Sequence, residues 1–238
     1  MDKPPGSLKV AIDGPAGAGK STVARRVAAQ LGLIYVDTGA MYRAVTWYVL
    51  ERGVQATDRS SVAALTDELD IRLALSADGQ RVIVNGQDVT GELRTPEVTG
   101  AVSEIAKIPE VRRRLTALQR SIAAGGGVVM DGRDIGTKVM PDAELKIYLT
   151  ASVEERARRR CEELKAAGIP VDMERLVREI RERDRTDEER EEAPLRKADD
   201  AVLIDSTALS IEEVVERIVR LAESKASKAS NAGKAKGS

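Results

Sequence analysis

A glycine-rich run near the N-terminus has the residue types and the spacing that hold a nucleoside triphosphate. Residues 14–21 read G-P-A-G-A-G-K-S, which is the pattern Gly-x-x-x-x-Gly-Lys-Ser. In such a loop the main-chain amides surround phosphate oxygens, the lysine reaches the β- and γ-phosphates, and the serine hydroxyl holds Mg²⁺. We therefore expect Lys20 to be catalytic and Ser21 to bind Mg²⁺. The residues expected to bind ATP or GTP are Gly14, Pro15, Ala16, Gly17, Ala18, Gly19, Lys20, Ser21 and Thr22.

The segments beside this loop favour the same interpretation. Residues 8–12 form a short apolar, partly β-branched run that suits a buried strand, and residues 22–31 have helical periodicity and end at Gly32, a natural C-cap. A strand, a glycine-rich loop and a helix N-terminus in this order converge on an anion. The alternative is a turn that merely joins a strand to a helix, which the flanking segments disfavour.

Composition excludes several other chemistries. The 238 residues include one cysteine, Cys161, and no histidine. This composition excludes an intramolecular disulfide framework, histidine general bases and histidine metal ligands. Lysine and arginine number 38, and aspartate and glutamate number 39. The chain therefore has no overall basic field for a nucleic acid, and we expect no nucleic-acid partner.

Apolar runs alternate with helical patterns along the rest of the chain. Further strands are predicted at residues 33–36, 128–130, 145–149 and 201–204. A helix is predicted at residues 41–51, and two more begin where Ser152 precedes Glu155 and Ser210 precedes Glu213 with the spacing of capping boxes. Strands that alternate with helices predict an α/β fold with a doubly wound parallel sheet.

One stretch interrupts this alternation. Residues 71–90 alternate at period two around an Asp78-Gly79 and an Asn85-Gly86 pair, both of which are strong hairpin signals. We expect a small antiparallel β insertion, within a segment of about residues 57–98, in a single domain of residues 1–223. The insertion either decorates the fold or clamps a second substrate.

A dense run of charge lies late in the chain. Residues 181–195 read R-E-R-D-R-T-D-E-E-R-E-E-A-P-L. Such a run is usually a solvated helix face with ion pairs four residues apart. Arg183, Arg185 and Arg190 lie between the last core helix and the last strand. That position favours a mobile lid over the triphosphate, which brings its charges into place on closure.

The two ends of the chain bear on its location. The N-terminal residues lack the apolar stretch of a signal peptide, and the sequence contains no apolar run of about 18 residues. We expect a cytoplasmic protein with no membrane partner. Residues 224–238 are small, polar and basic, and are predicted to be a disordered tail.

Polar side chains follow three of the predicted strands, at the sheet edge where open α/β folds bind ligands. These segments are residues 37–43, 131–134 and 205–207. Asp131 is expected to hold Mg²⁺ through water. Arg43 and Arg133 are expected to bind an anionic acceptor bidentately, which arginine does better than lysine. A single arginine here would be surface charge, but two beside a phosphate loop indicate an acceptor site.

The absence of histidine also bears on the acceptor. An alcohol needs a base to take its proton, whereas a phosphate acceptor is largely ionised near neutral pH because its second pKa is about 6. Catalysis then reduces to positioning and to charge neutralisation by lysine, arginine and Mg²⁺. A chain rich in arginine and without histidine therefore favours a phosphate acceptor.

Several of these motifs together resemble those of the bacterial cytidylate kinases, the ATP-dependent CMP/dCMP kinases. The matching segments are I-D-G-P-A-G-A-G-K-S-T at 12–22, D-T-G-A-M-Y-R at 37–43, R-T-P-E-V at 94–98, D-G-R-D-I-G-T at 131–137, R-D-R-T-D-E-E-R at 183–190, A-P-L at 193–195 and D-S-T at 205–207. They occur in order over nearly the whole chain apart from the tail. The pair D-T-G-A-M-Y-R and D-G-R-D-I-G-T is specific to this family.

The resemblance implies the fold and the roles of individual residues. It implies a P-loop nucleoside monophosphate kinase with a helical lid at about residues 181–195, acting as a monomer on ATP with Mg²⁺ and on CMP or dCMP. The residues implied to surround the CMP phosphate and sugar are Thr38, Arg43, Arg133 and Arg183, with Asp187 on the ribose. The residues implied to read the cytosine are Ser103, Arg112 and Asp134, with Asp134 on the exocyclic amine. The implied catalytic residues are Lys20, Arg133, Arg183 and Arg190.

Two other function classes stay open at this point. A P-loop kinase of a small-molecule hydroxyl, similar to shikimate kinase, would use Asp37 or Asp134 as its base. A nucleotide switch or motor would hydrolyse the triphosphate without a small product, but the sequence has no Asn-Lys-x-Asp motif for guanine.

Overall fold

The computed structural model describes residues 8–76, 79–166 and 168–234. By its internal contacts the chain divides into two compact units. The first comprises residues 1–35 and 123–238, and the second comprises residues 36–122. The second unit is wider than the predicted insertion of about residues 57–98, because helices on both sides of that segment pack into its core.

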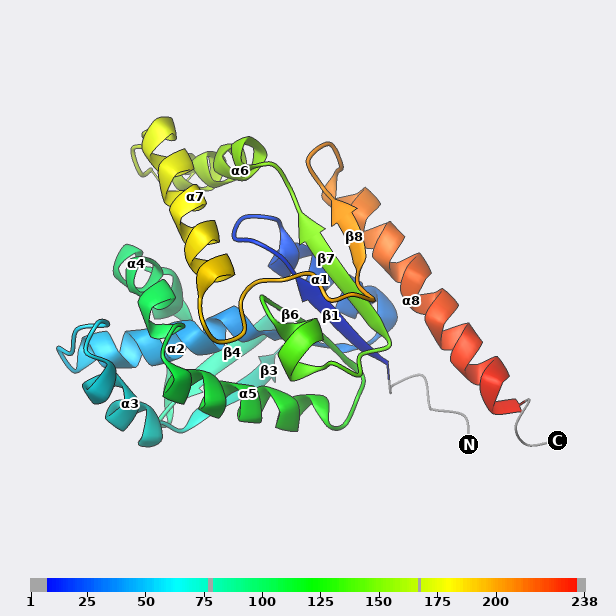
Figure 1. Cartoon of the computed structure of the whole chain (residues 1–238), viewed down its shortest axis with the longest axis horizontal. Helices are drawn as coiled ribbons and strands as arrows, with labels where there is room; N and C mark the ends of the chain where they lie inside the picture. The colour runs from blue at the N-terminus through cyan, green and yellow to red at the C-terminus, as the bar shows by residue number, and fades with distance from the viewer. Residues whose placement is uncertain (1–7, 77–78, 167, 235–238) are drawn as a thin grey trace. The chain divides into compact units, whose positions relative to one another are not determined.

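A five-stranded sheet forms the centre of the first unit (Figure 1). Its strands, in spatial order, are β2 (Ile34–Asp37), β6 (Val128–Gly132), β1 (Lys9–Asp13), β7 (Leu145–Thr150) and β8 (Val202–Asp205). Strand β1 pairs in parallel with β6 and β7, and β7 pairs in parallel with β8. The predicted doubly wound parallel sheet is therefore confirmed, with each predicted strand shifted or extended by one or two residues. Val10, Ala11 and Ile12 are fully buried, as continuous apolar runs in parallel sheets require.

Helices α1 (Lys20–Leu31) and α8 (Ile211–Lys234) pack against each other and against the sheet (Figure 1). Val23 and Val27 of α1 and Val214 and Ile218 of α8 form one apolar cluster with strand residues such as Ile12. Their spacing of four residues places each pair on one face of its helix. Among the described residues, no helix combines the length and the apolar character of a membrane span.

The end of α8 differs from the sequence prediction. A disordered tail was expected from residue 224, whereas α8 continues through Lys234. Residues 224–232 contain only alanine, serine, lysine and asparagine, with neither proline nor glycine to break a helix. Once the packed part of α8 has nucleated, each added turn costs little. Residues 235–238 lie outside the described residues.

Two further helices, α6 (Val153–Ala166) and α7 (Met173–Glu189), pack together through Ala157, Cys161, Leu176 and Ile180. A short π-helical turn, η3 (Ile135–Val139), packs against β1 and β6.

Only one of the two predicted capping boxes is complete. Ser210 and Glu213 exchange both bonds, since the Glu213 amide donates to Ser210 Oγ at 3.2 Å and the Ser210 amide donates to Glu213 Oε2 at 2.8 Å. Ser152 Oγ accepts from the Glu155 amide at 3.2 Å, but the Ser152 amide donates to Thr207 instead. The reciprocal box at Ser152 was wrong because arginines bind the Glu155 carboxylate.

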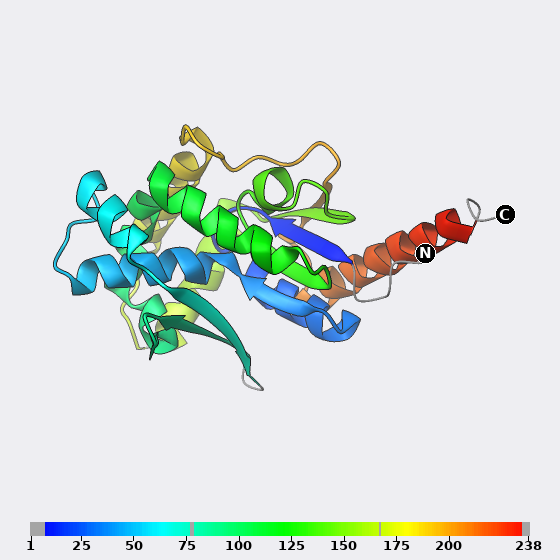
Figure 2. The same ribbon diagram turned by 90° about the horizontal axis from the view of Figure 1, so that it is seen from below.

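The second unit is built around a small antiparallel sheet of β3 (Ile71–Ser76), β4 (Gly79–Val84) and β5 (Gln87–Asp88). The predicted hairpin of β4 and β5 is confirmed: Asn85 and Gly86 have φ values of 48° and 85°, as a tight two-residue turn needs. Gly79 begins β4, and Asp78 lies outside the described residues. Figure 2 shows the hairpin of β3 and β4 beside α2.

Helices and a 3₁₀ turn complete the second unit. They are α2 (Thr38–Glu51), α3 (Arg59–Asp67), η2 (Thr90–Arg94), α4 (Pro96–Ile105) and α5 (Pro109–Ala123). Met41, Val45 and Val49 place one face of α2 against Val82 and Val84 of β4. Helix α2 begins three residues before the prediction because the Asp37 side chain caps it.

The first glycine of the phosphate loop is required by a close backbone approach. Gly14 has a φ of 149°, and a Cβ atom there would lie 1.9 Å from the carbonyl oxygen of Leu149 in β7. The Cβ clash with a backbone atom cannot be relieved by a side-chain rotation.

We predict that Gly14→Ala lowers the free energy of unfolding by about 2–4 kcal/mol, because it adds both strain and a steric clash. The matched control is Gly100→Ala in the interior of α4, where an added Cβ meets nothing within 4 Å. There alanine should raise the stability by about 0.5–1 kcal/mol. Urea unfolding of the two variants would contradict this account if their midpoints moved equally.

Candidate active site

The phosphate loop lies where the sequence placed it, between the end of β1 and the start of α1. Gly17 and Gly19 have φ values of 76° and 87°, and Gly19 is the N-cap of α1. The Lys20 ammonium donates to the carbonyl oxygen of Pro15 at 2.7 Å, so the loop folds around the lysine. The loop amides and the N-terminus of α1 together form the type of site that binds phosphate.

Lys20 lies among other charged groups of the first unit. It is 6% exposed, and its burial lowers its pKa well below the usual value. Arg133 lowers that pKa further, while Asp131 and Asp187 act in the opposite direction. The structure therefore brings residues from three predicted segments within electrostatic reach of the phosphate-loop lysine.

Ser21 and Asp131 are in direct contact. The Ser21 hydroxyl donates to Asp131 Oδ2 at 2.9 Å, and the Tyr35 hydroxyl donates to Asp131 Oδ1 at 2.9 Å. A hydroxyl and a carboxylate are ligands that Mg²⁺ accepts when phosphates and water supply the rest. No cluster of three carboxylate or cysteine side chains able to hold a metal was found within the described ranges. These residues fit a Mg²⁺ ion that arrives with a triphosphate.

Asp187 on α7 gathers the predicted arginines. Arg133 Nε donates to Asp187 Oδ2 at 2.8 Å, and Arg190 Nη1 lies 3.8 Å from Asp187 Oδ1. Burial by itself raises the pKa of Asp187, but Arg133, Arg190 and Arg183 outweigh it and lower that pKa. Burial likewise lowers the pKa of Arg133, and the carboxylates led by Asp187 outweigh it and raise that pKa. Asp187 thus organises three cations near Lys20.

The charged run of α7 has two different faces. Arg183, Asp187 and Arg190 are spaced by four and three residues and lie on the less exposed side. The residues that face solvent are Glu188, Glu189, Glu191 and Glu192. Arg185 also faces solvent and pairs with Glu182, apart from the cluster around Asp187, so its predicted role in the lid stays a prediction. The solvated-face alternative therefore describes the outer side only.

Arg156, which the sequence analysis missed, joins the phosphate loop to α7. It is 4% exposed and donates to the carbonyl oxygens of Ala151 at 2.9 Å and Ala16 at 3.1 Å. It also binds both carboxylate oxygens of Asp184 at 2.9 and 2.7 Å. In the sequence it is one arginine among several on a charged helix, and no local pattern marks it as buried.

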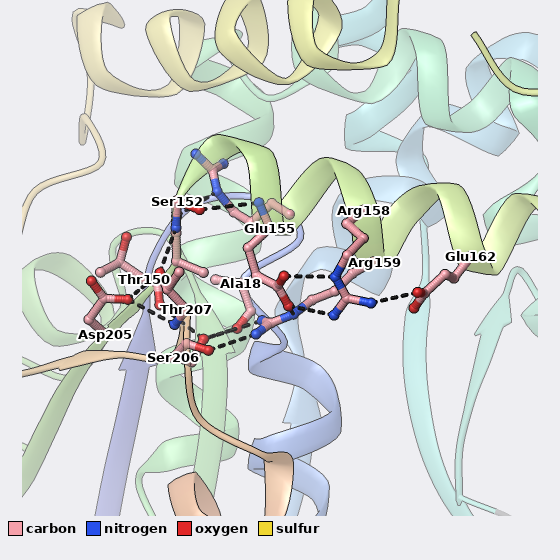
Figure 3. Close-up of polar contacts among 12 residues, drawn as sticks. Ala18, Thr150, Ser152, Glu155, Arg158, Arg159, Glu162, Asp205, Ser206 and Thr207 are labelled. Atoms are coloured by element: carbon pink, nitrogen blue, oxygen red, sulfur yellow. Dashed lines mark hydrogen bonds and ion pairs between the residues drawn. The ribbon is translucent and has the colours of Figure 1, made fainter. Parts of the chain in front are cut away.

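A second missed network holds the end of β8 beside the phosphate loop (Figure 3). Ser206 Oγ donates to the Thr150 carbonyl at 3.0 Å and lies 3.5 Å from that of Ala18. Arg159 donates to Ser206 Oγ at 3.2 Å and to its carbonyl oxygen at 2.7 Å. Hydrogen bonds from Arg158, and then Arg159, lower the pKa of Glu155 to about 2. An ionised Glu155 therefore orients Arg159.

In the second unit, the start of α2 holds Thr38 and Arg43. Asp37 accepts from the Ala40 amide at 2.9 Å and from Arg94 at 3.3 Å. A Cβ atom at Gly39 would lie 3.1 Å from both Arg43 Nη1 and Asp37 Oδ1, so the glycine lets Arg43 fold over the first turn. Thr38 is buried as the first residue of this turn.

Arg112 is held by its neighbours within the second unit. It is buried in α5, donates to the Ala106 carbonyl at 3.2 Å, and lies over the Tyr42 ring at 5.6 Å from the centroid. Ser103 lies on α4, which packs against α2.

The structure thus sorts the predicted site residues into two groups. The group of the first unit is the phosphate loop with Asp131, Arg133, Asp134, Arg183, Asp187 and Arg190, and that of the second is Thr38, Arg43, Ser103 and Arg112.

We predict that Arg156→Met destabilises the protein by about 3–5 kcal/mol, because it leaves Asp184 without its buried partner. The control Arg185→Met removes an exposed pair and should cost less than about 1 kcal/mol. The double variant Arg156→Met/Asp184→Leu should recover part of the loss, since no uncompensated charge remains. Urea unfolding measures all three, and equal losses for Arg156→Met and Arg185→Met would contradict the assignment.

A family model and close relatives match nearly the whole chain. The family model for cytidylate kinase matches residues 10–224. A cytidylate kinase of Geobacillus kaustophilus (strain HTA426) is 59% identical over 214 residues, which are 90% of this chain and 96% of the relative. A cytidylate kinase of Bacillus subtilis (strain 168) is 53% identical over 218 residues, which are 92% and 97% of the two chains.

A solved structure agrees on the fold. An uncharacterized protein from Eubacterium ventriosum ATCC 27560 superposes with a TM-score of 0.52 at 13% identity, covering 92% of this chain and 99% of its own. At that identity the likeness shows the fold alone. The family model and the close relatives span nearly the whole chain and include both groups of site residues, so this chain belongs to the cytidylate kinase family.

Proposed function

We propose that this chain transfers the γ-phosphoryl group of ATP to CMP or dCMP and releases ADP with CDP or dCDP. The observation that carries the proposal is the neighbourhood of Lys20: this lysine is 6% exposed in the phosphate loop, and burial and then the nearby, half-buried Arg133 lower its pKa. Asp131 and Asp187 offset part of this positive charge, and two neighbouring cations also favour an anion that binds both. A polyphosphate is such an anion, and the family membership agrees.

ATP binds at the phosphate loop in this proposal. The amides of residues 14–22 and the N-terminus of α1 receive its phosphates, and Lys20 neutralises the β- and γ-oxygens. Ser21 Oγ and Asp131 Oδ2 lie 2.9 Å apart, and these residues would hold Mg²⁺, Asp131 through water. When bound with ATP, Mg²⁺ supplies charge neutralisation on the transferring group.

The acceptor is a phosphate, so no general base is needed. The CMP phosphate is largely ionised near neutral pH. Arg43, Arg133 and Arg183 bind it, Thr38 adds a hydroxyl contact, and the arginines present planar forks to its oxygens. Asp37, the alternative base for a hydroxyl acceptor, is occupied by the Ala40 amide and by Arg94. This occupation favours the phosphate acceptor over a shikimate-like hydroxyl.

The lid residues act on the sugar and on the transferring group. Asp187 contacts the ribose, and Arg183 and Arg190 stabilise charge on the phosphoryl group as it moves. Their convergence on one carboxylate supports this assignment. Residues 181–195 form the proposed lid, and its closure over the substrates would exclude water from the reaction.

Asp134, Ser103 and Arg112 recognise the base. The exocyclic amine of cytosine donates a hydrogen bond, which an ionised Asp134 accepts, whereas uracil presents a carbonyl there. A site built around such a bond rejects the wrong base strongly, because a buried polar group is left unpaired. Asp134 is 5% exposed, as this discrimination needs.

The proposal includes the setting of the enzyme. We place it in the cytoplasm as a monomer that acts on small molecules, without a nucleic-acid or membrane partner. Its nearly balanced charge, 38 basic against 39 acidic side chains, supports the absence of a nucleic-acid partner.

Replacing Lys20 tests the phosphate loop. Lys20→Met keeps the length of the side chain and removes its charge, so kcat should fall by roughly 10²–10³-fold as transition-state stabilisation is lost. The control Lys165→Ala, at an exposed site near the end of α6, should leave kcat unchanged. A coupled ADP-release assay measures both, and a Lys20→Met enzyme within a few-fold of the wild type would contradict the proposed role.

Replacing Asp134 tests base recognition. Asp134→Asn removes the ionised acceptor, so the preference of kcat/KM for CMP over UMP should shrink by at least about tenfold. The exposed Asp199→Asn is the control and should keep the wild-type preference. An unchanged preference in Asp134→Asn would overturn the assignment of the base-reading residue.

A further inference from the structure

The last residue of β1 is a buried acid with no role in the predicted site. Asp13 is 5% exposed and directly precedes the phosphate loop. It pairs across the sheet with Gly132 of β6 and Tyr148 of β7, so it lies at the carboxyl end of the central strand. A carboxylate at this depth costs free energy unless hydrogen bonds satisfy it.

Asp13 is satisfied by two main-chain amides of the segment that follows β6. Oδ1 accepts from the Ile135 amide at 2.8 Å, and Oδ2 accepts from the Gly136 amide at 2.7 Å. An ionised carboxylate offers a strong acceptor on each oxygen, whereas an asparagine would turn an NH₂ group toward one of the two donors. The contact joins the phosphate loop to the segment that carries Arg133 and Asp134.

The fit between this segment and Asp13 is tight. A Cβ atom at Gly136 would lie 3.1 Å from Lys146 Cδ and 3.3 Å from Asp13 Oδ2. The segment therefore has almost no room to move toward β1 or β7. Asp134 immediately precedes the two amides that Asp13 holds, so its place depends on them.

Charged groups on the surrounding elements face Asp13. Burial raises the pKa of Asp13 to about 6, the amide bonds lower it, Asp134 raises it and Lys20 lowers it. On β7, burial is the main cause of the raised pKa of Tyr148, and the charges of Glu188, Asp184 and Asp13 add to it. The Lys146 ammonium is turned to Pro141 and Asp200. Because the folded pKa lies above the ordinary value, Asp13 gains its proton, and loses one acceptor, as pH falls through about 6.

We propose that Asp13 is a positioning residue for the CMP site, which fixes the segment of Arg133 and Asp134 through the amides of Ile135 and Gly136. This inference rests on the proposed function, because it assigns the contact to recognition of the monophosphate. Through the same two hydrogen bonds, Asp13 would keep the segment that binds CMP at a constant distance from the start of the phosphate loop.

The test compares Asp13→Asn with the control Asp58→Asn. Asp58 is exposed and also accepts a main-chain amide, as the N-cap of α3. Asparagine caps a helix as well as aspartate does, so the control should leave the enzyme unchanged. In Asp13→Asn we expect KM for CMP to rise at least about tenfold, KM for ATP to stay within about twofold, and the preference for CMP over UMP to shrink. Equal rises in both KM values, or an unchanged preference, would overturn the proposal.

A second variant protects the test against misfolding of Asp13→Asn. Gly136→Ala pushes the segment away from Asp13 and Lys146, and should raise KM for CMP with little effect on KM for ATP. Gly125→Ala, where an added Cβ meets nothing within 4 Å, is its control and should match the wild type. A Gly136→Ala enzyme with the wild-type KM for CMP would count against the proposal.

The pH dependence of KM for CMP distinguishes the positioning role from a purely structural one, which would not change this dependence. The ratio of KM for CMP between Asp13→Asn and the wild type should fall toward one between pH 7.5 and pH 5, as the wild-type carboxyl gains its proton. The phosphate of CMP titrates in the same range, but it does so for both enzymes and cancels in the ratio. A ratio that stays constant would contradict the positioning role.

Amide hydrogen exchange separates this inference from the proposed function. In Asp13→Asn without substrate, the amides of Ile135 and Gly136 should exchange faster, while those of α8 stay as in the wild type. A wild-type enzyme unable to phosphorylate CMP would overturn the proposed function, and unchanged exchange at Ile135 and Gly136 would overturn the positioning role.

Discussion

Buried charge at the carboxyl edge of the five-stranded sheet is the constraint on which the first unit depends. The charged side chains buried there include Asp13, Lys20, Asp131, Asp134, Arg156 and Asp187. A charge removed from water costs several kcal/mol unless hydrogen bonds and opposite charges surround it. Four of them bind a partner from another segment: Asp13 binds the amides of Ile135 and Gly136, Asp131 binds Ser21, Arg156 binds Asp184 and Asp187 binds Arg133. The phosphate loop, the residues after β6 and helix α7 therefore fix one another. The same contacts therefore stabilise the fold and position the residues proposed to bind phosphate.

The features predicted correctly from the sequence are those that local pattern determines. Continuous apolar runs marked the parallel strands, and Asn85-Gly86 marked a turn that needs two positive φ values. The phosphate loop was recognisable because Gly14, Gly17 and Gly19 must adopt conformations or approaches that other residues avoid. The complete lack of histidine was equally informative, because it excludes histidine general bases and histidine metal ligands.

The features that escaped prediction depend on distant partners. Arg156 and Arg159 belong to the same charged helix as the exposed Arg158, yet they reach Ala16 and Ser206, which no spacing rule identifies. The same holds on α7, where Arg183 and Arg185 differ by two positions and face opposite ways. Asp13 directly follows the predicted strand of residues 8–12, and no local pattern indicates that its carboxylate accepts the amides of Ile135 and Gly136.

In the proposed reaction, cations and no general base stabilise the transfer of a phosphoryl group to an ionised monophosphate that carries cytosine. The most direct test incubates the wild-type protein with ATP and Mg²⁺ and, separately, with CMP, dCMP, UMP, AMP or shikimate, and quantifies ADP and the phosphorylated product by ion-exchange chromatography. We expect one CDP or dCDP for each ADP, with far slower turnover of UMP, AMP and shikimate. Turnover of shikimate or UMP as fast as that of CMP would contradict it.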